Sequence, residues 1–342
     1  MRRIVVLGGL GLFGRTAVEQ LCALGAKAKT AGRGASADIR VDANDAESIR
    51  GVLRAGDVVI DTAGPFYART NALLEAAIDA SFDIVDINDD LNYAERVLTF
   101  RDRIERAGIR LLSSASTVSA IAAAVVRRSG IPAPVGIASC LAPASRHTAN
   151  AGAARSLLRS VGRPVRALRR GDLKTLRGWE ESRPFAMPPP LENVRGRLFE
   201  SADALYLPLI WPTLRDVAMY VAPNVPGMDP LLRLASRMPP LRRLLEAQVD
   251  FGAAIARRIG SVHGGIGYEI EDPGGNIARY AILAQTNSYV MAVAPAVAAA
   301  VAIAHDRFPD RGLVLPDRHA EPAALFEYLG SLGIECVELA PL

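Results

Sequence analysis

Glycines are concentrated near the start of the chain, in the segment GGLGLFG at residues 8–14. Gly9, Gly11 and Gly14 match the GxGxxG pattern of dinucleotide-binding loops. In such loops the glycines permit a tight turn, let the backbone approach a pyrophosphate, and let a helix pack closely on a strand. The free N–H groups at the start of that helix favour a bound anion. The pattern predicts pyrophosphate contacts from Gly8, Gly9, Gly11, Leu12, Phe13 and Gly14. The simpler alternative is a glycine-rich turn that binds no ligand.

The residues after the second predicted strand indicate which dinucleotide fits. An NAD site normally places an acidic residue about 20 positions beyond the glycines, where its carboxylate holds the ribose 2′-OH. No acidic residue lies between Glu19 and Asp38, and Arg33 stands in this window. A guanidinium beside the ribose favours a 2′-phosphate, so we expect NADP(H), although Arg33 could also be an ordinary solvated loop charge. Asp42, after the third predicted strand, is expected either to border the adenine or to begin the next turn.

A third segment, DTAGPFY at residues 61–67, follows the fourth predicted strand. Small residues at the carboxyl end of a parallel strand let a ligand come close to the backbone. We therefore expect Ala63, Gly64 and Pro65 to contact the cofactor or the substrate. The alternative is an ordinary strand-to-helix turn.

The first 130 residues must position these segments, and their apolar pattern alternates between short runs and helical periodicity. Asn44 and Glu47 are spaced as a capping box at the start of the second predicted helix. Such alternation predicts an α/β fold in which a Rossmann-type doubly wound parallel sheet has helices on both faces. Strands are expected at 3–7, 27–31, 39–41, 57–61, 83–87 and 109–112, and helices at 13–24, 44–54, 70–80 and 91–107.

After residue 130 the pattern becomes irregular, and we expect a second, α+β domain over 131–287 for substrate binding or dimerisation. The segment 288–342 is expected to return to the first domain. Its apolar stretch 289–304 is shorter than the about 20 residues of a bilayer span, so it predicts a buried core helix. Within the second domain we expect strands at 164–168 and 214–221, a hairpin from 261–270 and 276–285, and a Pro/Arg-rich loop at 182–191.

The overall composition excludes several classes of protein. The chain has 342 residues, 50% of them hydrophobic, which is enough for about two domains. The 40 Lys and Arg residues exceed the 36 Asp and Glu residues by only four, and no basic stripe with interleaved aromatics argues for nucleic acid. Cys22, Cys140 and Cys336 are too few and too far apart for a disulfide framework or a structural zinc site. We expect no metal, no nucleic acid, no stable membrane span and a cytoplasmic location.

Four segments, GGLGLFGR, AGR, DTAGPF and FDIVDIND, resemble the NADP-binding domain of the saccharopine dehydrogenase-like (saccharopine reductase) oxidoreductases. Residues 151–179 are similar to the same family more weakly. The resemblance implies a Rossmann domain, NADP(H), and a second α+β domain that often forms a homodimer contact. The chain differs from the family's pattern at Asn88-Asp89-Asp90 and at residues 113–117, where a substrate would be expected.

Candidates for proton transfer are few. Asp89 could act as an acid or orient the substrate, although an acidic pair with Asp90 is commonly a solvated turn. His147 begins a predicted helix after a strand and could project into a cleft between the domains, or it could simply lie at the surface. His305 and His319 are expected to face solvent. The chain has no Tyr-x-x-x-Lys pair of the kind that short-chain dehydrogenases use.

Together these patterns predict an NADPH-dependent oxidoreductase that transfers hydride to a C=N, C=O or activated C=C bond of a small metabolite. Ligands of open α/β sheets bind outside the carboxyl ends of the strands. The active site is therefore expected between the two domains, near Gly64, Pro65 and Asp89. The alternative is a non-catalytic NADP-binding redox sensor whose second domain serves partners.

Overall fold

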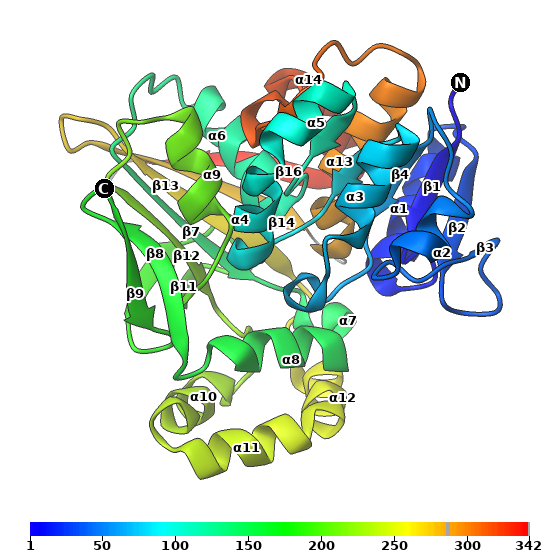
Figure 1. The fold of residues 1–342 in the computed structure, drawn as a ribbon. Helices are drawn as coiled ribbons and strands as arrows, with labels where there is room; N and C mark the ends of the chain where they lie inside the picture. The colour runs from blue at the N-terminus through cyan, green and yellow to red at the C-terminus, as the bar shows by residue number, and fades with distance from the viewer. Residues whose placement is uncertain (285–287, 341–342) are drawn as a thin grey trace. The chain divides into compact units, whose positions relative to one another are not determined.

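The chain divides into two compact units in the computed structural model, which describes residues 1–284 and 288–340. The first unit comprises Met1–Ala124 and Tyr289–Tyr328, and the second comprises Val125–Ser288 and Leu329–Leu342. Figure 1 shows the helices and strands of both units. The expected domain boundary at residue 287 and the expected end of the hairpin at residue 285 lie outside the described residues.

The first unit is built on a seven-stranded parallel sheet in the order β15-β6-β5-β4-β1-β2-β3. Strands β1, β4 and β5 are buried along their whole length, which explains their nearly continuous apolar sequences, IVVL, VVID and DIVD. The predicted doubly wound parallel sheet is confirmed. In chain order its strands are β1 (Ile4–Leu7), β2 (Ala28–Gly32), β3 (Ile39–Arg40), β4 (Val58–Asp61), β5 (Asp83–Asp86), β6 (Arg110–Leu112) and β15 (Gly312–Val314).

The path of the chain through this sheet changes direction once. From β1 it runs through β2 to the edge strand β3, returns to β4 beside β1, and continues through β5 to β6. Because connections between parallel strands are right-handed, the helices of the two halves cover opposite faces. The carboxyl ends of β1 and β4 therefore flank the switch point where open α/β sheets bind ligands. The helices of this unit include α1 (Leu12–Ala23), α2 (Ala46–Arg50), α3 (Ala72–Ala80), α4 (Leu91–Thr99), α5 (Arg101–Ala107), α13 (Ser288–Ala304) and α14 (Pro322–Ser331).

Helix α13 belongs to the core of the first unit. Its side chains Val293, Ala296 and Ile303 are fully buried in the same apolar cluster as the strands, so the prediction of a buried core helix is confirmed. The Gln20 amide of α1 donates a hydrogen bond of 2.9 Å to the Val290 carbonyl oxygen, which ties the two helices together. No helix among the described residues is both long enough and apolar enough to cross a bilayer.

The second unit is built on a mixed nine-stranded sheet, which confirms the predicted α+β domain. Strands β7 and β12 are parallel, and their other neighbours are antiparallel. Its strands are β7 (Gly136–Ala142), β8 (Pro164–Arg169), β9 (Asp172–Arg177), β10 (Ser182–Ala186), β11 (Asn193–Phe199), β12 (Asp216–Val221), β13 (Gly264–Glu271), β14 (Ile277–Ala284) and β16 (Ile334–Leu339). Helix α6 (Ala122–Arg128) leads from the first unit into the second. The helices that follow it in the second unit are α7 (Ser145–Thr148), α8 (Ala151–Ser160), α9 (Asp203–Ile210), α10 (Met228–Arg237), α11 (Pro239–Ala247) and α12 (Val249–Ile259).

Two local predictions in the first unit differ from the structure. The cap of α2 is Asp45 and not Asn44, because the Asp45 carboxylate accepts a hydrogen bond of 3.0 Å from the Glu47 N–H. The helix expected over 91–107 is divided at Phe100 into α4 and α5. Both differences concern the ends of elements, where one residue of shift changes the hydrogen-bond partner.

Two predictions about the rest of the chain were wrong in part. Residues 182–191 are not only a loop, because β10 pairs with β11 there, and Pro184 is tolerated since β10 is an edge strand. The segment 288–342 does not return to the first unit as a whole. From Leu329 onward it belongs to the second unit, because β16 completes a ladder of six residue pairs with β14.

Candidate functional site

The glycine loop between β1 and α1 is closely packed. Gly8 has a φ of +80°, and its N–H donates a hydrogen bond of 2.8 Å to the Ala31 carbonyl oxygen of β2. A Cβ at Gly14 would lie 2.2 Å from the Gly8 carbonyl oxygen, so only glycine lets α1 begin this close to β1. The tight turn and the close packing of helix on strand are therefore both present.

Gly11, by contrast, is open on its side-chain side. A Cβ there would meet only the Gly8 carbonyl oxygen, at 3.1 Å. Gly11 is the N-cap of α1, so the N–H groups of Leu12, Phe13 and Gly14 are the first-turn donors that a helix cannot satisfy by itself. The start of α1 can therefore receive an anion close to the backbone.

The turn after β4 lies directly against this loop. A Cβ at Gly8 would lie 2.8 Å from the backbone nitrogen of Ala63. Beyond Ala63 the chain reaches the surface, where Gly64 and Pro65 are exposed and joined by a cis peptide bond. The structure thus brings Gly8 and Ala63 together at the switch point and leaves Gly64 and Pro65 accessible.

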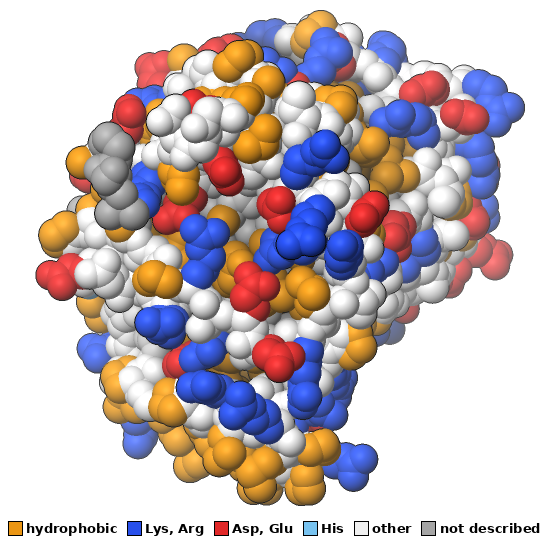
Figure 2. Space-filling model, turned by 90° about the vertical axis from the view of Figure 1, so that its left-hand side faces the viewer, with side chains coloured by type: hydrophobic (Ala, Val, Ile, Leu, Met, Phe, Trp, Pro, Cys, Tyr) orange, Lys and Arg blue, Asp and Glu red, His pale blue; other side chains and the backbone are white. Residues whose placement is uncertain are grey.

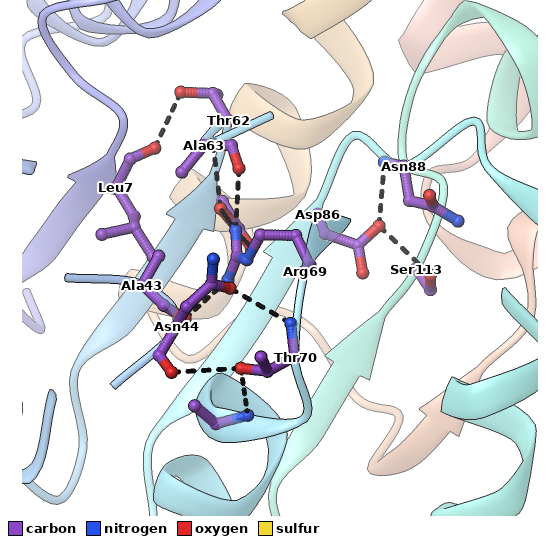
Figure 3. Close-up of polar contacts among 12 residues, drawn as sticks. Leu7, Ala43, Asn44, Thr62, Ala63, Arg69, Thr70, Asp86, Asn88 and Ser113 are labelled. Carbon is purple, nitrogen blue, oxygen red and sulfur yellow. Dashed lines mark hydrogen bonds and ion pairs between the residues drawn. The ribbon is translucent and has the colours of Figure 1, made fainter. Parts of the chain in front are cut away.

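A buried arginine holds this turn in place (Figure 3). The Arg69 guanidinium lies 2.8 Å from Asp61 Oδ2, and its Nη1 donates a hydrogen bond of 2.9 Å to the Ala63 carbonyl oxygen. Its Nη2 donates to the Ala43 carbonyl oxygen, after β3, at 3.3 Å. The side chains of Arg69 and Asp61 are 3% and 0% exposed. One guanidinium therefore joins the end of β4, the turn that follows it and the loop after β3.

Asp86 ends β5 beside Asp61, which ends β4. Its Oδ1 accepts hydrogen bonds from the N–H groups of Asn88 (3.0 Å) and Ser114 (2.8 Å) and from the Ser113 hydroxyl (3.1 Å). Figure 3 shows the carboxylate between the loops after β5 and β6. The side chain is fully buried, and its Oδ2 has no hydrogen-bond partner among the described residues. Asp86 therefore organises both loops while one of its oxygens stays unpaired.

Burial among charges shifts the pKa values of these groups. Desolvation, together with the negative charge of Asp61, raises the pKa of Asp86 to about 7, against the lowering effect of its hydrogen bonds. Burial alone would lower the pKa of Arg69, but the negative charges of Asp61 and Asp86 outweigh it and raise that pKa above its usual value. Arg69 therefore stays charged, and Asp86 titrates near neutral pH.

Arg33 directly follows β2 and is exposed. The loop that it begins folds back, so that the Asp38 carboxylate accepts hydrogen bonds from the Thr30 N–H and the Thr30 hydroxyl, both at 2.8 Å. These hydrogen bonds lower the pKa of Asp38. An acidic side chain, Asp38, therefore does contact β2. Its distance from the glycines in the sequence could not reveal this, because the loop folds back and brings Asp38 to Thr30 in space.

Two predicted acidic residues, Asp42 and Asp89, lie outside the helices and strands. Asp42 Oδ1 accepts a hydrogen bond of 2.9 Å from the Asn44 N–H, so Asp42 begins a turn, which was one of the two interpretations. Asp89 is exposed at the surface beside Asp90, and the negative charge of Asp90 raises the pKa of Asp89.

The histidines differ in their surroundings. His147 lies in α7 of the second unit and is exposed, and His305 is exposed as expected. The expectation for His319 was wrong: it is 1% exposed, and its Nε2 lies 3.0 Å from the Val314 carbonyl oxygen of β15. Burial lowers the pKa of His319 to about 4, so this side chain is a neutral part of the packing.

The second unit contains a pocket of about 250 Å³ that the sequence did not indicate. Small residues, including Gly136, Ala138 and Ala218, line part of it, and the rest of the lining is mainly charged. Arg169 and Glu181 form an ion pair there at 3.0 Å. The lining mixes arginines and carboxylates from strands that are distant in sequence, which is why no local motif announced it.

Comparisons with known proteins bear on the fold. The structure of apo saccharopine dehydrogenase (L-Glu forming) from Saccharomyces cerevisiae matches this chain with a TM-score of 0.69 and 13% sequence identity, over 99% of this chain and 100% of that one. A myo-inositol 2-dehydrogenase from Lactobacillus plantarum matches with a TM-score of 0.41 and 9% identity, over 99% of both chains, which is too distant to carry an argument. No family model matches the chain, and no curated protein matches it in sequence. The resemblance found in the sequence is therefore confirmed as a similarity of fold: the chain is folded like a saccharopine dehydrogenase.

Proposed function

We propose that the first unit binds NADP(H) and that the chain is an oxidoreductase of the saccharopine dehydrogenase-like type. The proposed reaction transfers hydride to a C=N, C=O or activated C=C bond of a small metabolite. The observation that carries the proposal is the switch point, where an open Gly11 begins α1 and an accessible Gly64 follows β4. The fold shared with a saccharopine dehydrogenase supports the same class of reaction.

The residues at the switch point fit each part of a dinucleotide. The first-turn N–H groups of α1, from Leu12 to Gly14, would hold the pyrophosphate. Arg33 would meet the 2′-phosphate, and Asp42 would border the adenine. The turn of Ala63, Gly64 and Pro65 would face the nicotinamide half, since it packs against Gly8 at the end of the neighbouring strand β4. A Cβ at Gly11 would occupy the space that the pyrophosphate needs.

The bound nicotinamide would supply or accept the hydride. The chain itself therefore has to bind the cofactor, orient the substrate and move a proton. Arg69 keeps the turn at Ala63 in one conformation through its bonds to Asp61 and to the Ala63 carbonyl oxygen. Asp89 is the first candidate to give a proton from its carboxyl group, because the adjacent charge of Asp90 raises its pKa. His147 in the second unit is the other candidate.

The proposal is tested by titrating the purified chain with NADPH and then following NADPH oxidation with a panel of imines, keto acids and enones. We expect saturable NADPH binding and turnover with at least one of these acceptor classes. Tight binding without turnover on the whole panel would favour a non-catalytic NADP-binding sensor. A homodimer is part of the same proposal, and sedimentation velocity of the same sample tests it.

Gly11→Val tests the place of the cofactor. Its φ of −76° is open to valine, so the variant should fold, while the branched side chain fills the space above the helix start. We expect NADPH binding to be lost while the variant stays folded, with a small fall in melting temperature because valine replaces glycine at the N-cap. Gly330→Val in α14 is the matched control, because nothing lies within 4 Å of its added Cβ. Full NADPH affinity in folded Gly11→Val would overturn the assignment.

A further inference from the structure

Three consecutive helices of the second unit, α10, α11 and α12, carry apolar side chains on two sides. One side packs inward, where Leu232, Ala235 and Val249 join a buried cluster with Trp179 and with Leu158 of α8. This inward side accounts for the stability of the three helices. The other side points to solvent and needs a separate explanation.

On α12 the outward side is a regular apolar stripe. Phe251, Ile255 and Ile259 follow one another at intervals of four residues, which places them along one face of the helix. They are 65%, 36% and 49% exposed. The opposite face carries Ala253 and Ala256, which are buried. The stripe is therefore a second apolar face and not an edge of the core.

Helices α10 and α11 also carry exposed apolar residues. Leu231, Leu234 and Met238 are 37%, 50% and 46% exposed at spacings of three and four residues, and Leu244 of α11 is 57% exposed. Single exposed leucines are ordinary, but a concentration of them marks an interaction surface. Seven of the twelve large hydrophobic residues that are most exposed among the described residues fall within 231–259. We call these seven the apolar face: Leu231, Leu234, Met238, Leu244, Phe251, Ile255 and Ile259.

Arginines accompany the apolar face. Residues 228–259 contain six arginines and three acidic residues, a net charge of +3, whereas the whole chain carries +4. Five of these arginines are exposed: Arg233, Arg237, Arg243, Arg257 and Arg258. Figure 2 shows hydrophobic side chains along the lower edge, where α11 lies in Figure 1, with Lys or Arg side chains directly above them. Exposed arginines therefore stand on the same three helices as the exposed apolar residues.

We propose that the apolar face binds the surface of a bilayer containing anionic lipids. Apolar side chains that enter the boundary between headgroups and acyl chains are stabilised by burial, and flanking arginines are attracted to anionic headgroups while their stems stay in apolar surroundings. A second copy of the chain suits the face less well. A two-fold contact would bring the same arginine-rich surface against itself, and like charges would oppose one another. Such binding lies on the surface and involves no spanning helix.

Flotation with lipid vesicles tests the proposal. The full chain is mixed with vesicles of phosphatidylcholine alone or of phosphatidylcholine with phosphatidylglycerol, and the bound fraction is measured after centrifugation. We expect binding to the anionic vesicles, weaker binding to the neutral ones, and a loss of binding as salt screens the arginines. The chain remaining at the bottom of the gradient with both kinds of vesicle would overturn the proposal.

Two sets of variants separate the apolar and the basic contributions. Phe251→Ser/Ile255→Ser/Ile259→Ser should lower the partition coefficient by at least about tenfold, because three partly exposed side chains lose their burial in lipid. Arg237→Glu/Arg243→Glu/Arg258→Glu should abolish the preference for anionic vesicles. The matched control is Leu24→Ser/Leu173→Ser/Leu209→Ser, three leucines of similar exposure (46%, 38% and 45%) outside the apolar face. All three sets change exposed residues, so the melting temperature should remain near that of the wild type.

Two results would contradict this assignment directly. Equal loss of vesicle binding in the control set would mean that any exposed leucine contributes and that the face has no special role. A dimer in sedimentation velocity that dissociates in the Phe251/Ile255/Ile259 variant, without any vesicle binding by the wild type, would assign the face to a second copy instead. Neither result depends on catalytic activity or on cofactor binding.

Discussion

Asp61, Arg69 and Asp86 of the first unit lie at or beside the carboxyl ends of β4 and β5, and none of their side chains is more than 3% exposed. In the second unit, the ion pair of Arg169 and Glu181 lines a pocket, and its side chains are 21% and 43% exposed. A charge out of contact with water depends on its partner, because desolvation is costly and no solvent can replace the lost interaction. A charge at the surface loses little when its partner is removed.

Ion pairs of similar chemistry therefore have different roles in the two units. The buried network of the first unit fixes loops around the proposed cofactor site, so its loss should affect stability and binding together. The Arg169–Glu181 pair of the second unit is partly exposed, so its loss should leave the fold nearly unaffected, and it is open to a ligand. Five predictions test this difference and the proposed cofactor site.

The largest effect is expected for Arg69→Met. Asp61 would remain buried without its partner, and the carbonyl oxygens of Ala43 and Ala63 would lose a donor. Breaking a buried pair in this way typically costs about 3–5 kcal/mol of unfolding free energy. Urea denaturation of the wild type and the variant measures it. Arg69→Met/Asp61→Asn should recover part of the loss, and a cost no larger than that of a surface pair would show that water reaches Asp61.

The second effect concerns pH and Asp86. Its folded pKa of about 7 lies above the ordinary aspartate value of 3.8, so between these values the folded chain holds a proton that the unfolded chain has released. Stability should therefore fall as the pH rises through this window and level off above about 7. In Asp86→Asn, which keeps the oxygen that accepts from Asn88 and Ser114, this slope of melting temperature against pH should be smaller.

Asp89→Asn is the control for that experiment. Its carboxylate is exposed, so its removal should leave more of the slope in place than the removal of the buried Asp86. An Asp86→Asn variant with the full wild-type slope would show that the buried network does not titrate in this range. The buried charge would then be fully balanced by Arg69.

The third effect is on cofactor choice and leaves stability unchanged. Arg33 is exposed, so Arg33→Ala should not alter the melting temperature. A hydrogen bond to a charged group contributes about 1.5–3 kcal/mol, so NADPH binding should weaken by at least about tenfold while NADH binding stays nearly the same. Arg40 of β3 could share this role, and Arg33→Ala/Arg40→Ala measures its part. Equal losses for both cofactors in both variants would refute the selectivity argument.

Asp38 offers a converse test of the same site. Its carboxylate is held at β2 by Thr30 and carries a negative charge near the place proposed for the 2′-phosphate. Asp38→Asn removes that charge and keeps an oxygen for the same hydrogen bonds. It should therefore improve NADPH binding relative to NADH, the opposite of Arg33→Ala.

The smallest effect is expected in the second unit, for Arg169→Met. Glu181 is 43% exposed and can be hydrated when its partner is lost, so the unfolding free energy should change by no more than about 1 kcal/mol. Urea denaturation under the conditions used for Arg69→Met gives the direct comparison. A loss as large as that of Arg69→Met would show that the pocket is a structural element and would erase the contrast between the units.

The site could be predicted from the sequence where its residues are neighbours in the chain. Gly8, Gly11 and Gly14 are read from local spacing, and the DTAGPF segment is read from its place after an apolar run. Arg69 could not be found in this way, because its partners Asp61, Ala63 and Ala43 stand at spacings that match no periodicity. The prediction for His319 was wrong for a similar reason. Its polar side chain suggested exposure to solvent, but the short turn Pro316–Arg318 after β15 places it in a buried position.

The sequence by itself determined the parallel sheet of the first unit, the glycine loop between β1 and α1, and α13 as a core helix, because apolar periodicity and glycine spacing act over a few residues. Only the tertiary structure decided that β16 pairs with β14, that Asp38 returns to β2, and that Asp61, Arg69 and Asp86 share one buried network. Hydrogen bonds and ion pairs between distant segments leave no mark on local composition. They depend on where the fold places the ends of the strands.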